Sequence, residues 1–314
     1  MANLAQAQVD QSAVDNFVRN VAYQQKRPMA DVAAILAEAK FQPTVIDKMT
    51  RPAEKTMTWE RYRNIFIKEE RIGAGVAFWE ENEKTLNQVS SETGVSIETI
   101  IGILGVETYF GQRMGTYRVL DALYTLAFGY PKRASFFKSE LKKFLELSEK
   151  EGLDPLEIKG SYAGAIGYGQ FMPSSYLAYA KSFDPATSAD LVYEVEDGIA
   201  SVANYIKVHR WEKGARVAVT ANKSTTAETL PKQKVRPSNA ASFYTSKGYE
   251  ASEAIGESEI VSLQAMTMED GSKEYWFTLE NFYVITRYNH SPLYALAVFQ
   301  LGEAVSRARK ADKL

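Results

Sequence analysis

The sequence contains no cysteine and only two histidines, His209 and His290, among its 314 residues. The absence of cysteine excludes disulfides, thiol nucleophiles and thiolate metal sites. Two histidines are too few for a three-histidine zinc site, and a Ser-His-Asp triad would have to use one of them. The common metal and nucleophile chemistries of hydrolases are therefore disfavoured, and we interpret both histidines as surface or core-edge residues.

Long apolar runs are also missing, since no stretch approaches the roughly 20 residues that cross a bilayer. The first residues, Met1–Gln8, lack the charged and apolar regions of a signal peptide. The formal net charge of −2, from 37 basic and 39 acidic residues, gives no sign of a nucleic-acid partner. With 45% hydrophobic and 24% charged residues, the chain can bury a large core. We expect a soluble globular protein of two or three domains.

Most of the chain carries the periodicity of amphipathic helices. Apolar spacing predicts helices over Ser12–Tyr23, Met29–Ala39, Trp59–Ile67, Ile72–Leu86, Val119–Phe128, Ser135–Lys150, Ser174–Phe183, Val195–Val208 and Pro292–Arg309. Between about Glu212 and Ile285 the pattern changes to short β-prone runs. Three strands are predicted there, at Glu259–Met266, Glu274–Leu279 and Phe282–Ile285, and Asp270-Gly271 forms the turn between the first two. We expect a mainly α protein with a small inserted β module.

One carboxylate, Glu107, lies near the end of an otherwise apolar predicted helix, Ile97–Phe110. Ser96 is a suitable N-cap, and Gly111 can end the helix in a left-handed conformation. Glu107 lies three residues after Leu104 and so joins the buried side of this helix.

Burial and the negative end of the helix dipole both favour the protonated form of Glu107. A protonated carboxyl near neutral pH is what a general acid requires. The alternative is a buried structural glutamate that bonds a backbone amide or an arginine, and this segment alone leaves both interpretations open.

A second motif, Ser161–Pro173, is rich in glycine, tyrosine and amide side chains. Its closely spaced glycines predict tight turns or a close approach by a ligand. Ser161 and Gln170 could bond sugar hydroxyls and N-acetyl groups, while a tyrosine stacks on a pyranose face. A purely structural turn is equally compatible with the motif.

A third motif, Thr286–Tyr294, follows the β module. Tyr288, Asn289 and Tyr294 are unusual so near the start of a helix unless they face a cleft. The alternative is a helix start in which Asn and Ser cap the backbone.

A calcium loop would have to lie at Asp184, between two predicted helices. An EF-hand loop needs glycine at its sixth position and an acid at its twelfth. Counted from Asp184, these positions hold Ala189 and Val195. We therefore expect a connecting loop and no metal or other cofactor.

The motifs together resemble the membrane-bound lytic murein transglycosylase B family over roughly residues 10–305. The resemblance rests on Gly105–Gly111, Ser161–Ser175, Ser201–Tyr205 and Arg287–Tyr294, in this order. It implies a lysozyme-like core, an N-terminal helical domain and a small β domain inserted late in the core. The corresponding boundaries are 1–80 for the helical domain, 81–211 for the catalytic core, 212–285 for the β domain, and 286–314 for the return to the core.

Residue by residue, the resemblance makes Glu107 the single catalytic acid and base. Ser161, Gln170, Tyr205, Tyr288 and Tyr294 match positions that line the saccharide groove, and we add Asn289 to them. Family members can carry an EF-hand-like calcium loop, from whose ligand pattern Asp184–Glu196 departs. They commonly begin with a lipidated cysteine, so outer-membrane anchoring would require a longer precursor.

The implied activity is a cleavage of peptidoglycan glycan strands in the periplasm by a monomer. The β-1,4 bond between N-acetylmuramic acid and N-acetylglucosamine is broken without water, which leaves a 1,6-anhydro end. One alternative is a hydrolytic muramidase, which needs a second carboxylate such as Asp121, Glu140 or Asp154. The other is a non-catalytic peptidoglycan-binding or scaffold protein. A zinc amidase is disfavoured by the scarcity of histidine and cysteine.

Overall fold

The computed structural model describes residues 9–50 and 57–311, which fold into two compact units. The first unit holds the described residues up to 50 together with 111–198, and the second holds 57–110 and 199–311. Helices dominate both units and one small sheet lies in the second, so the prediction of a mainly helical α+β protein is confirmed. The predicted domain boundaries at residues 80, 211 and 285 remain a proposal.

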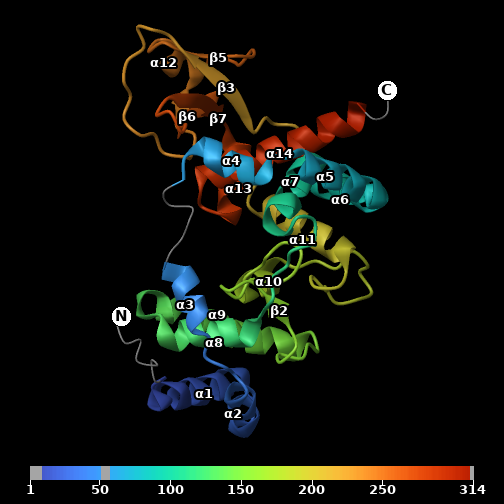
Figure 1. The fold of residues 1–314 in the computed structure, drawn as a ribbon. Helices are drawn as coiled ribbons and strands as arrows, with labels where there is room; N and C mark the ends of the chain where they lie inside the picture. Colours follow the sequence, from blue (N-terminus) through green and yellow to red (C-terminus); the bar gives the residue numbers. More distant parts are fainter. Residues whose placement is uncertain (1–8, 51–56, 312–314) are drawn as a thin grey trace. The chain divides into compact units, whose positions relative to one another are not determined.

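The first unit is built from helices and one two-stranded sheet (Figure 1). Its elements are α1 (Gln11–Gln25), α2 (Met29–Ala37), α3 (Pro43–Thr50), β1 (Tyr117–Arg118), α8 (Val119–Gly129), η2 (Pro131–Arg133), α9 (Ala134–Lys150), β2 (Lys159–Gly160) and α10 (Pro173–Tyr179). Packing of α8 on α9 supplies much of the core, through buried residues such as Leu123, Leu126 and Leu141. The helix α10 ends at Tyr179, four residues before the predicted end at Phe183.

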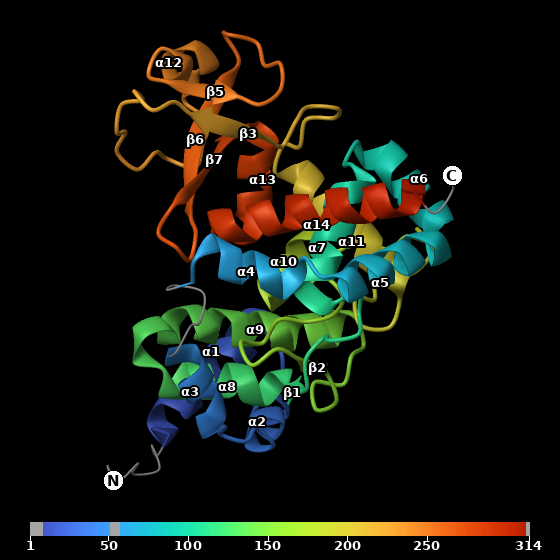
Figure 2. The ribbon, with the colours of Figure 1, turned by 45° about the horizontal axis from the view of Figure 1, so that its top comes forward.

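The second unit combines a group of helices with the larger sheet (Figure 2). Its elements are α4 (Trp59–Phe66), α5 (Glu69–Glu81), α6 (Glu83–Thr93), α7 (Ile97–Thr108), most of α11 (Val195–Val208), β3 (Ala218–Lys223), β4 (Asn239–Ala240), α12 (Ala241–Thr245), β5 (Tyr249–Ala251), β6 (Ile260–Thr267), β7 (Lys273–Thr278), α13 (Glu280–Tyr288) and α14 (Pro292–Ala311). The predicted helix Ile72–Leu86 is divided at Asn82, which caps α5 and precedes α6.

The sheet is antiparallel with the strand order β4-β6-β7-β3-β5. The predicted hairpin is confirmed: Gly271 adopts φ 82° in the turn between β6 and β7, and Ala265 pairs with Tyr275. The third predicted strand, Phe282–Ile285, is wrong, because these residues lie in α13. Phe282 and Ile285 are spaced for one face of a helix and are fully buried there, so tertiary packing overrides the strand preference of Val and Ile.

Two glycines bring α7 and α14 into close contact (Figure 2). A Cβ atom added at Gly302 would lie 2.1 Å from the carbonyl oxygen of Glu98, and one at Gly102 would lie 2.2 Å from that of Val298. Real Cβ atoms do not come so close, so the two backbones can pack at this distance only without side chains. Ser306 adds a hydrogen bond of 3.0 Å from its hydroxyl to the Glu98 carboxylate.

The helices in the part of the chain that the structure describes were compared with the length and apolar composition of a membrane span. No single helix there has the length and apolar character to cross a bilayer. The helices α6 and α7 meet the criterion only as a pair, which is bent by 117°.

Candidate active site

Glu107 lies in the last turn of α7, whose start follows the prediction. The hydroxyl of Ser96 accepts a hydrogen bond from the Thr99 amide, and Val95 and Ile100 are fully buried as a staple around this cap. Glu107 itself is half-buried. The sequence predicted a more buried position, but the chain turns out of the helix directly after Thr108, which leaves this turn partly exposed.

The helix ends in a run of left-handed residues rather than at a single glycine. Tyr109, Phe110 and Gly111 have φ values of 53°, 58° and 87°. The amides of Tyr109 and Phe110 both donate to the carbonyl oxygen of Leu104, so α7 ends at Thr108 and not at the predicted Phe110. A left-handed conformation costs a residue other than glycine roughly 1–2 kcal/mol. Such strain beside a candidate catalytic group is typical of functional sites.

Contacts of the two aromatic rings hold this strained turn. Phe110 stacks on Phe78 with ring centroids 5.4 Å apart. The guanidinium of Arg71 lies 4.8 Å from the centre of the Tyr109 ring. Arg71 is buried. Its role was not predictable from the sequence, because one arginine in a charged helical segment gives no local signal.

Tyr294 contacts Glu107 directly. Its hydroxyl donates a hydrogen bond of 2.7 Å to Oε1 of Glu107, and its side chain is 2% exposed. Burial, and then the negative charge of Glu107, raise the pKa of Tyr294 well above its ordinary value. Tyr294 therefore keeps its proton at all physiological pH values and remains a donor to the carboxyl group.

Two more predicted residues extend this cluster. The Tyr288 ring is parallel to that of Tyr294, with centroids 6.5 Å apart, and lies 4.8 Å from that of Tyr205. Burial and the charge of Glu107 also raise the pKa of Tyr288 well above its ordinary value. The Tyr205 hydroxyl donates to the carbonyl oxygen of Arg287 at 2.6 Å. His209 stacks on Tyr205 with centroids 4.1 Å apart, which places it at the edge of the cluster.

Asn289 joins the two helices that carry these tyrosines. It is the C-cap of α13, has an extended backbone and is half-buried. Its carbonyl oxygen accepts a hydrogen bond of 2.8 Å from the Ser291 amide, just before Pro292 begins α14. The described contacts thus show Asn289 shaping the chain between Tyr288 and Tyr294, while its contact with a sugar remains a prediction.

Ser161 and Gln170 belong to the other compact unit, and their described hydrogen bonds stay within that unit. The Ser161 hydroxyl accepts from the amides of Ala163 and Ala165, at 3.2 and 3.0 Å. The Nε2 group of Gln170 donates to the carbonyl oxygens of Met114 and Gly167, both at 3.0 Å. These bonds fit the structural interpretation that the sequence left open. The predicted sugar contacts of both residues stay predictions.

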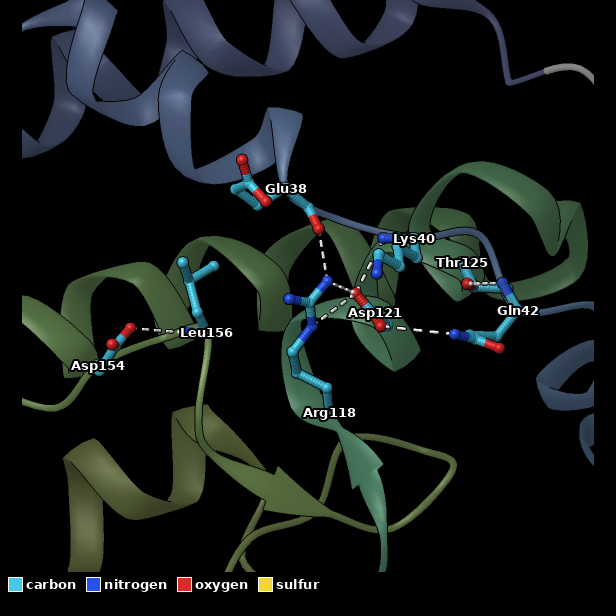
Figure 3. Close-up of polar contacts among 8 residues, drawn as sticks. All are labelled: Glu38, Lys40, Gln42, Arg118, Asp121, Thr125, Asp154 and Leu156. Atoms are coloured by element: carbon cyan, nitrogen blue, oxygen red, sulfur yellow. Dashed lines mark hydrogen bonds and ion pairs between the residues drawn. The ribbon is translucent and has the colours of Figure 1, made fainter.

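The carboxylates that a hydrolytic muramidase would need each have structural partners in this unit. Asp121 accepts from Nε of Arg118 and from the Lys40 amide, both at 2.9 Å, and Asp154 accepts from the Leu156 amide at 2.8 Å (Figure 3). Glu140 is buried and accepts from the amide and hydroxyl of Ser174. These bonds position loops and helix ends.

The loop after α10 is organised by carboxylate contacts with its own backbone. Asp197 is buried, and its two oxygens accept from the amides of Phe183 and Asp190, each at 2.7 Å. Asp184 and Asp190 cap the turns that follow them, through bonds to the amides of Ala186 and Val192. Among the described residues, no group of three or more His, Cys, Asp or Glu side chains is arranged to hold a metal ion.

The chain is similar to known proteins over most of its length. The family model described as "Transglycosylase SLT domain" matches residues 9–303. Membrane-bound lytic murein transglycosylase B of Escherichia coli (strain K12) is 44% identical over 284 residues, which are 88% of this chain and 77% of that protein.

Solved structures show the same fold. Soluble lytic transglycosylase SltB1 of Pseudomonas aeruginosa has a TM-score of 0.86 at 38% identity, over 95% of this chain and 99% of that one. Escherichia coli lytic transglycosylase Slt35 in complex with calcium has a TM-score of 0.87 at 41% identity, over 97% and 95% of the two chains. These relatives confirm the predicted lysozyme-like fold class. The chain belongs to the family of transglycosylases with the SLT domain, and it is an enzyme, a lytic transglycosylase.

Proposed function

We propose that this enzyme cleaves the β-1,4 bond between N-acetylmuramic acid and N-acetylglucosamine of peptidoglycan and leaves a 1,6-anhydro end. The observation that carries the proposal is the hydrogen bond of 2.7 Å from Tyr294 to Oε1 of Glu107. It ties one carboxyl oxygen to an accepting role and fixes the plane of the carboxyl group. The carboxyl group of Glu107 is the proposed route of proton transfer to and from the substrate.

In the first step, protonated Glu107 donates its proton to the glycosidic oxygen. The bond between this oxygen and C1 of the muramic acid breaks, the oxygen keeps the electron pair, and positive charge develops at C1. In the second step, the Glu107 carboxylate removes the proton of the C6 hydroxyl in the same sugar, and O6 attacks C1. Glu107 ends protonated as it began, and no water is consumed.

A single carboxyl group suffices for this sequence, whereas hydrolysis with retention or inversion uses two. Asp121, Glu140 and Asp154 are each held by structural hydrogen bonds. This supports the anhydro reaction over hydrolysis. A digest of purified sacculi tests the proposal, because borohydride reduces the ends made by hydrolysis but not 1,6-anhydro ends. We expect cleavage without new reducible ends, and reducible ends equal to the number of cuts would refute the proposal.

Peptidoglycan glycan strands are the proposed partner, the periplasm is the proposed location and a monomer is the proposed acting form. The relative named membrane-bound lytic murein transglycosylase B supports the substrate and the location. The three tyrosines beside Glu107, with Ser161, Gln170 and Asn289, are the proposed substrate contacts.

We expect Tyr294→Phe to lower turnover roughly ten- to a hundredfold, because a hydrogen bond to a charged group is typically worth about 1.5–3 kcal/mol. The phenylalanine ring fills the same buried space, so the melting temperature should change little. Steady-state rates on sacculi measure the effect. Tyr193→Phe is the matched control, since Tyr193 is 69% exposed. Equal rates for the two variants would show that the hydroxyl of Tyr294 does not act on Glu107.

We expect calcium to have no effect on stability. The carboxylate of Asp197 already bonds two backbone amides of the loop, and the EF-hand glycine and terminal acid are missing. Thermal melts in calcium and in chelator should coincide. A ligand that binds only the native state must raise the melting temperature, so a clear rise with calcium would contradict this prediction even though a relative was crystallised with calcium.

A further inference from the structure

The hydrophobic core of the β module covers only part of one face of the β sheet. The strand registers place Ala221 and Lys223 of β3, Tyr249 of β5, Leu263, Ala265 and Thr267 of β6, and Lys273, Tyr275 and Phe277 of β7 on this face. At one end, Leu263 and Phe277 pack with Tyr244 of α12 in a closed core. At the other end, Ala265, Thr267 and Lys273 lie beyond this core.

The uncovered end forms a cavity of about 690 Å³. Its floor is the sheet at Ala265, Lys273 and Tyr275, and its wall is the segment Thr229–Gln233. The volume lies within the roughly 300–1,000 Å³ typical of pockets that hold small ligands. The core of the module therefore leaves open a cavity of the size of a small ligand on this sheet face.

Charge of one sign lines this cavity. Lys223, Lys232 and Lys273 are among its lining residues, and no aspartate or glutamate is. In the part of the chain that the structure describes, none of these three lysines forms an ion pair, whereas Lys247 of the same module pairs with Glu228. We name this cavity the lysine pocket. Three ammonium groups without counter-ions favour an anionic ligand.

The aromatic floor of the lysine pocket is fixed in place. The rings of Tyr249 and Tyr275 are 5.2 Å apart, and the hydroxyl of Tyr249 donates to the carbonyl oxygen of Glu228 at 2.9 Å. Nζ of Lys223 lies 5.9 Å from the centre of the Tyr275 ring. A ring beside ammonium groups suits a ligand that joins a carboxylate to a short aliphatic chain.

We propose that the lysine pocket binds the free carboxylates of the peptide stems of peptidoglycan. The inference rests on the proposed function, in which this polymer is the substrate. Three ammonium groups attract anionic groups more strongly than neutral sugar hydroxyls. Peptide stems carry such anionic groups, as carboxylates on short side chains. A nucleic acid is disfavoured by the sequence pI of about 5.9 and by the net charge of −2.

The β7 strand that carries Lys273 and Tyr275 leads directly into α13, whose last residue is Tyr288. Peptide bound at the sheet and glycan bound beside Glu107 would thus be held by one continuous segment of the second unit. The pocket is expected to select stem-bearing strands rather than to take part in bond cleavage.

Titration calorimetry with a synthetic stem tetrapeptide tests the proposal, because the free peptide has no glycosidic bond to cleave. The same peptide with all carboxyls amidated is the ligand control. The variant is Lys223→Gln with Lys273→Gln. The control is the double variant Lys84→Gln with Lys132→Gln. It changes the net charge by the same amount as the pocket variant, at exposed lysines outside the pocket. We expect the pocket variant to bind the acidic peptide on the order of tenfold more weakly, since each lysine supplies a hydrogen bond to a charged group.

The control variant should bind the acidic peptide as the wild type does, and the amidated peptide should bind the wild type weakly. Equal affinity of the pocket variant and the wild type for the acidic peptide would overturn the proposal. So would tight binding of an oligonucleotide that is lost in the pocket variant, together with no binding of the peptide.

An assay on glycan strands without peptide stems distinguishes this inference from the proposed function. On them the pocket variant should form anhydro products at the wild-type rate, and on intact sacculi its KM should rise. Absence of anhydro products from wild-type enzyme on both substrates would defeat the proposed function. Anhydro products with unaltered peptide binding by the pocket variant would defeat only the lysine pocket.

Discussion

Glu107→Gln is expected to lower turnover of peptidoglycan by at least the roughly 10²–10⁴-fold typical of losing general acid–base catalysis. The amide can neither donate the proton to the leaving oxygen nor remove the proton from the C6 hydroxyl, and one residue performs both steps. Tyr294 can still donate to the amide oxygen, because this contact needs only an acceptor at the position of Oε1. The fold should survive, with a change in the free energy of unfolding within about 1 kcal/mol.

Glu98→Gln is the matched control for this variant. Glu98 lies in the first turn of the same helix and is half-buried like Glu107, but it bonds Ser306. Rates on sacculi, melting curves and a sacculus pull-down separate the outcomes. We expect Glu107→Gln to fold and to bind sacculi without cleaving them. Wild-type activity would remove Glu107 from the mechanism, and a collapsed fold would favour its structural interpretation.

Gly302→Ala should lower both the stability of the protein and its catalytic rate. The added methyl group would lie 2.1 Å from the Glu98 carbonyl oxygen, so α14 must move away from α7. Such overpacking costs typically about 1–3 kcal/mol, occasionally more. The two helices carry Tyr294 and Glu107, whose bond must then lengthen. Since a misplacement of about 1 Å can cost roughly 10²-fold in rate, we expect a loss of that order in the folded variant.

Gly73→Ala is the control for the same chemical change. Gly73 lies in α5, and an added Cβ there would meet nothing within 4 Å. This variant should be more stable by roughly 0.5–1 kcal/mol, as expected for Gly to Ala inside a helix, and fully active. Urea melts and rates measured well below the melting temperature check both variants. Unchanged stability and rate for Gly302→Ala would show that the close packing of α7 and α14 does not hold the site.

Local sequence signals predicted the parts of the site that depend on neighbouring residues. The cap at Ser96, the staple of Val95 and Ile100, and the apolar periodicity of the following residues located α7 and the position of Glu107 on it. The turn Asp270-Gly271 likewise located the hairpin of β6 and β7. These features need no knowledge of the rest of the fold, because their partners lie within a few residues.

Features that depend on distant residues were not predictable in this way. Glycines ordinarily weaken a helix, and nothing in the sequence connects Gly102 with Val298 or Gly302 with Glu98. The strand preference of Phe282–Ile285 gave the wrong element for the same reason, since burial within the second unit decides it.

Side-chain roles were the hardest to predict. Ser161 and Gln170 could serve a sugar or their own loop, and only the distances to Ala165 and Met114 show how much of their hydrogen bonding the backbone itself uses. The sequence marked Tyr294 as a residue that faces a cleft and, by resemblance, lines the saccharide groove, but not as a partner of Glu107. Its bond to Glu107 depends on the packing of two helices whose bonding residues are 187 positions apart.

Mass spectrometry of the muropeptides released from purified sacculi in ¹⁸O-enriched water tests the central claim most directly. If Glu107 removes the C6 hydroxyl proton and O6 closes the ring, each new muramic end lacks one water relative to a reducing end and contains no ¹⁸O. New ends that carry ¹⁸O at C1, with the mass of a reducing sugar, would show that water attacks C1 and would contradict the account.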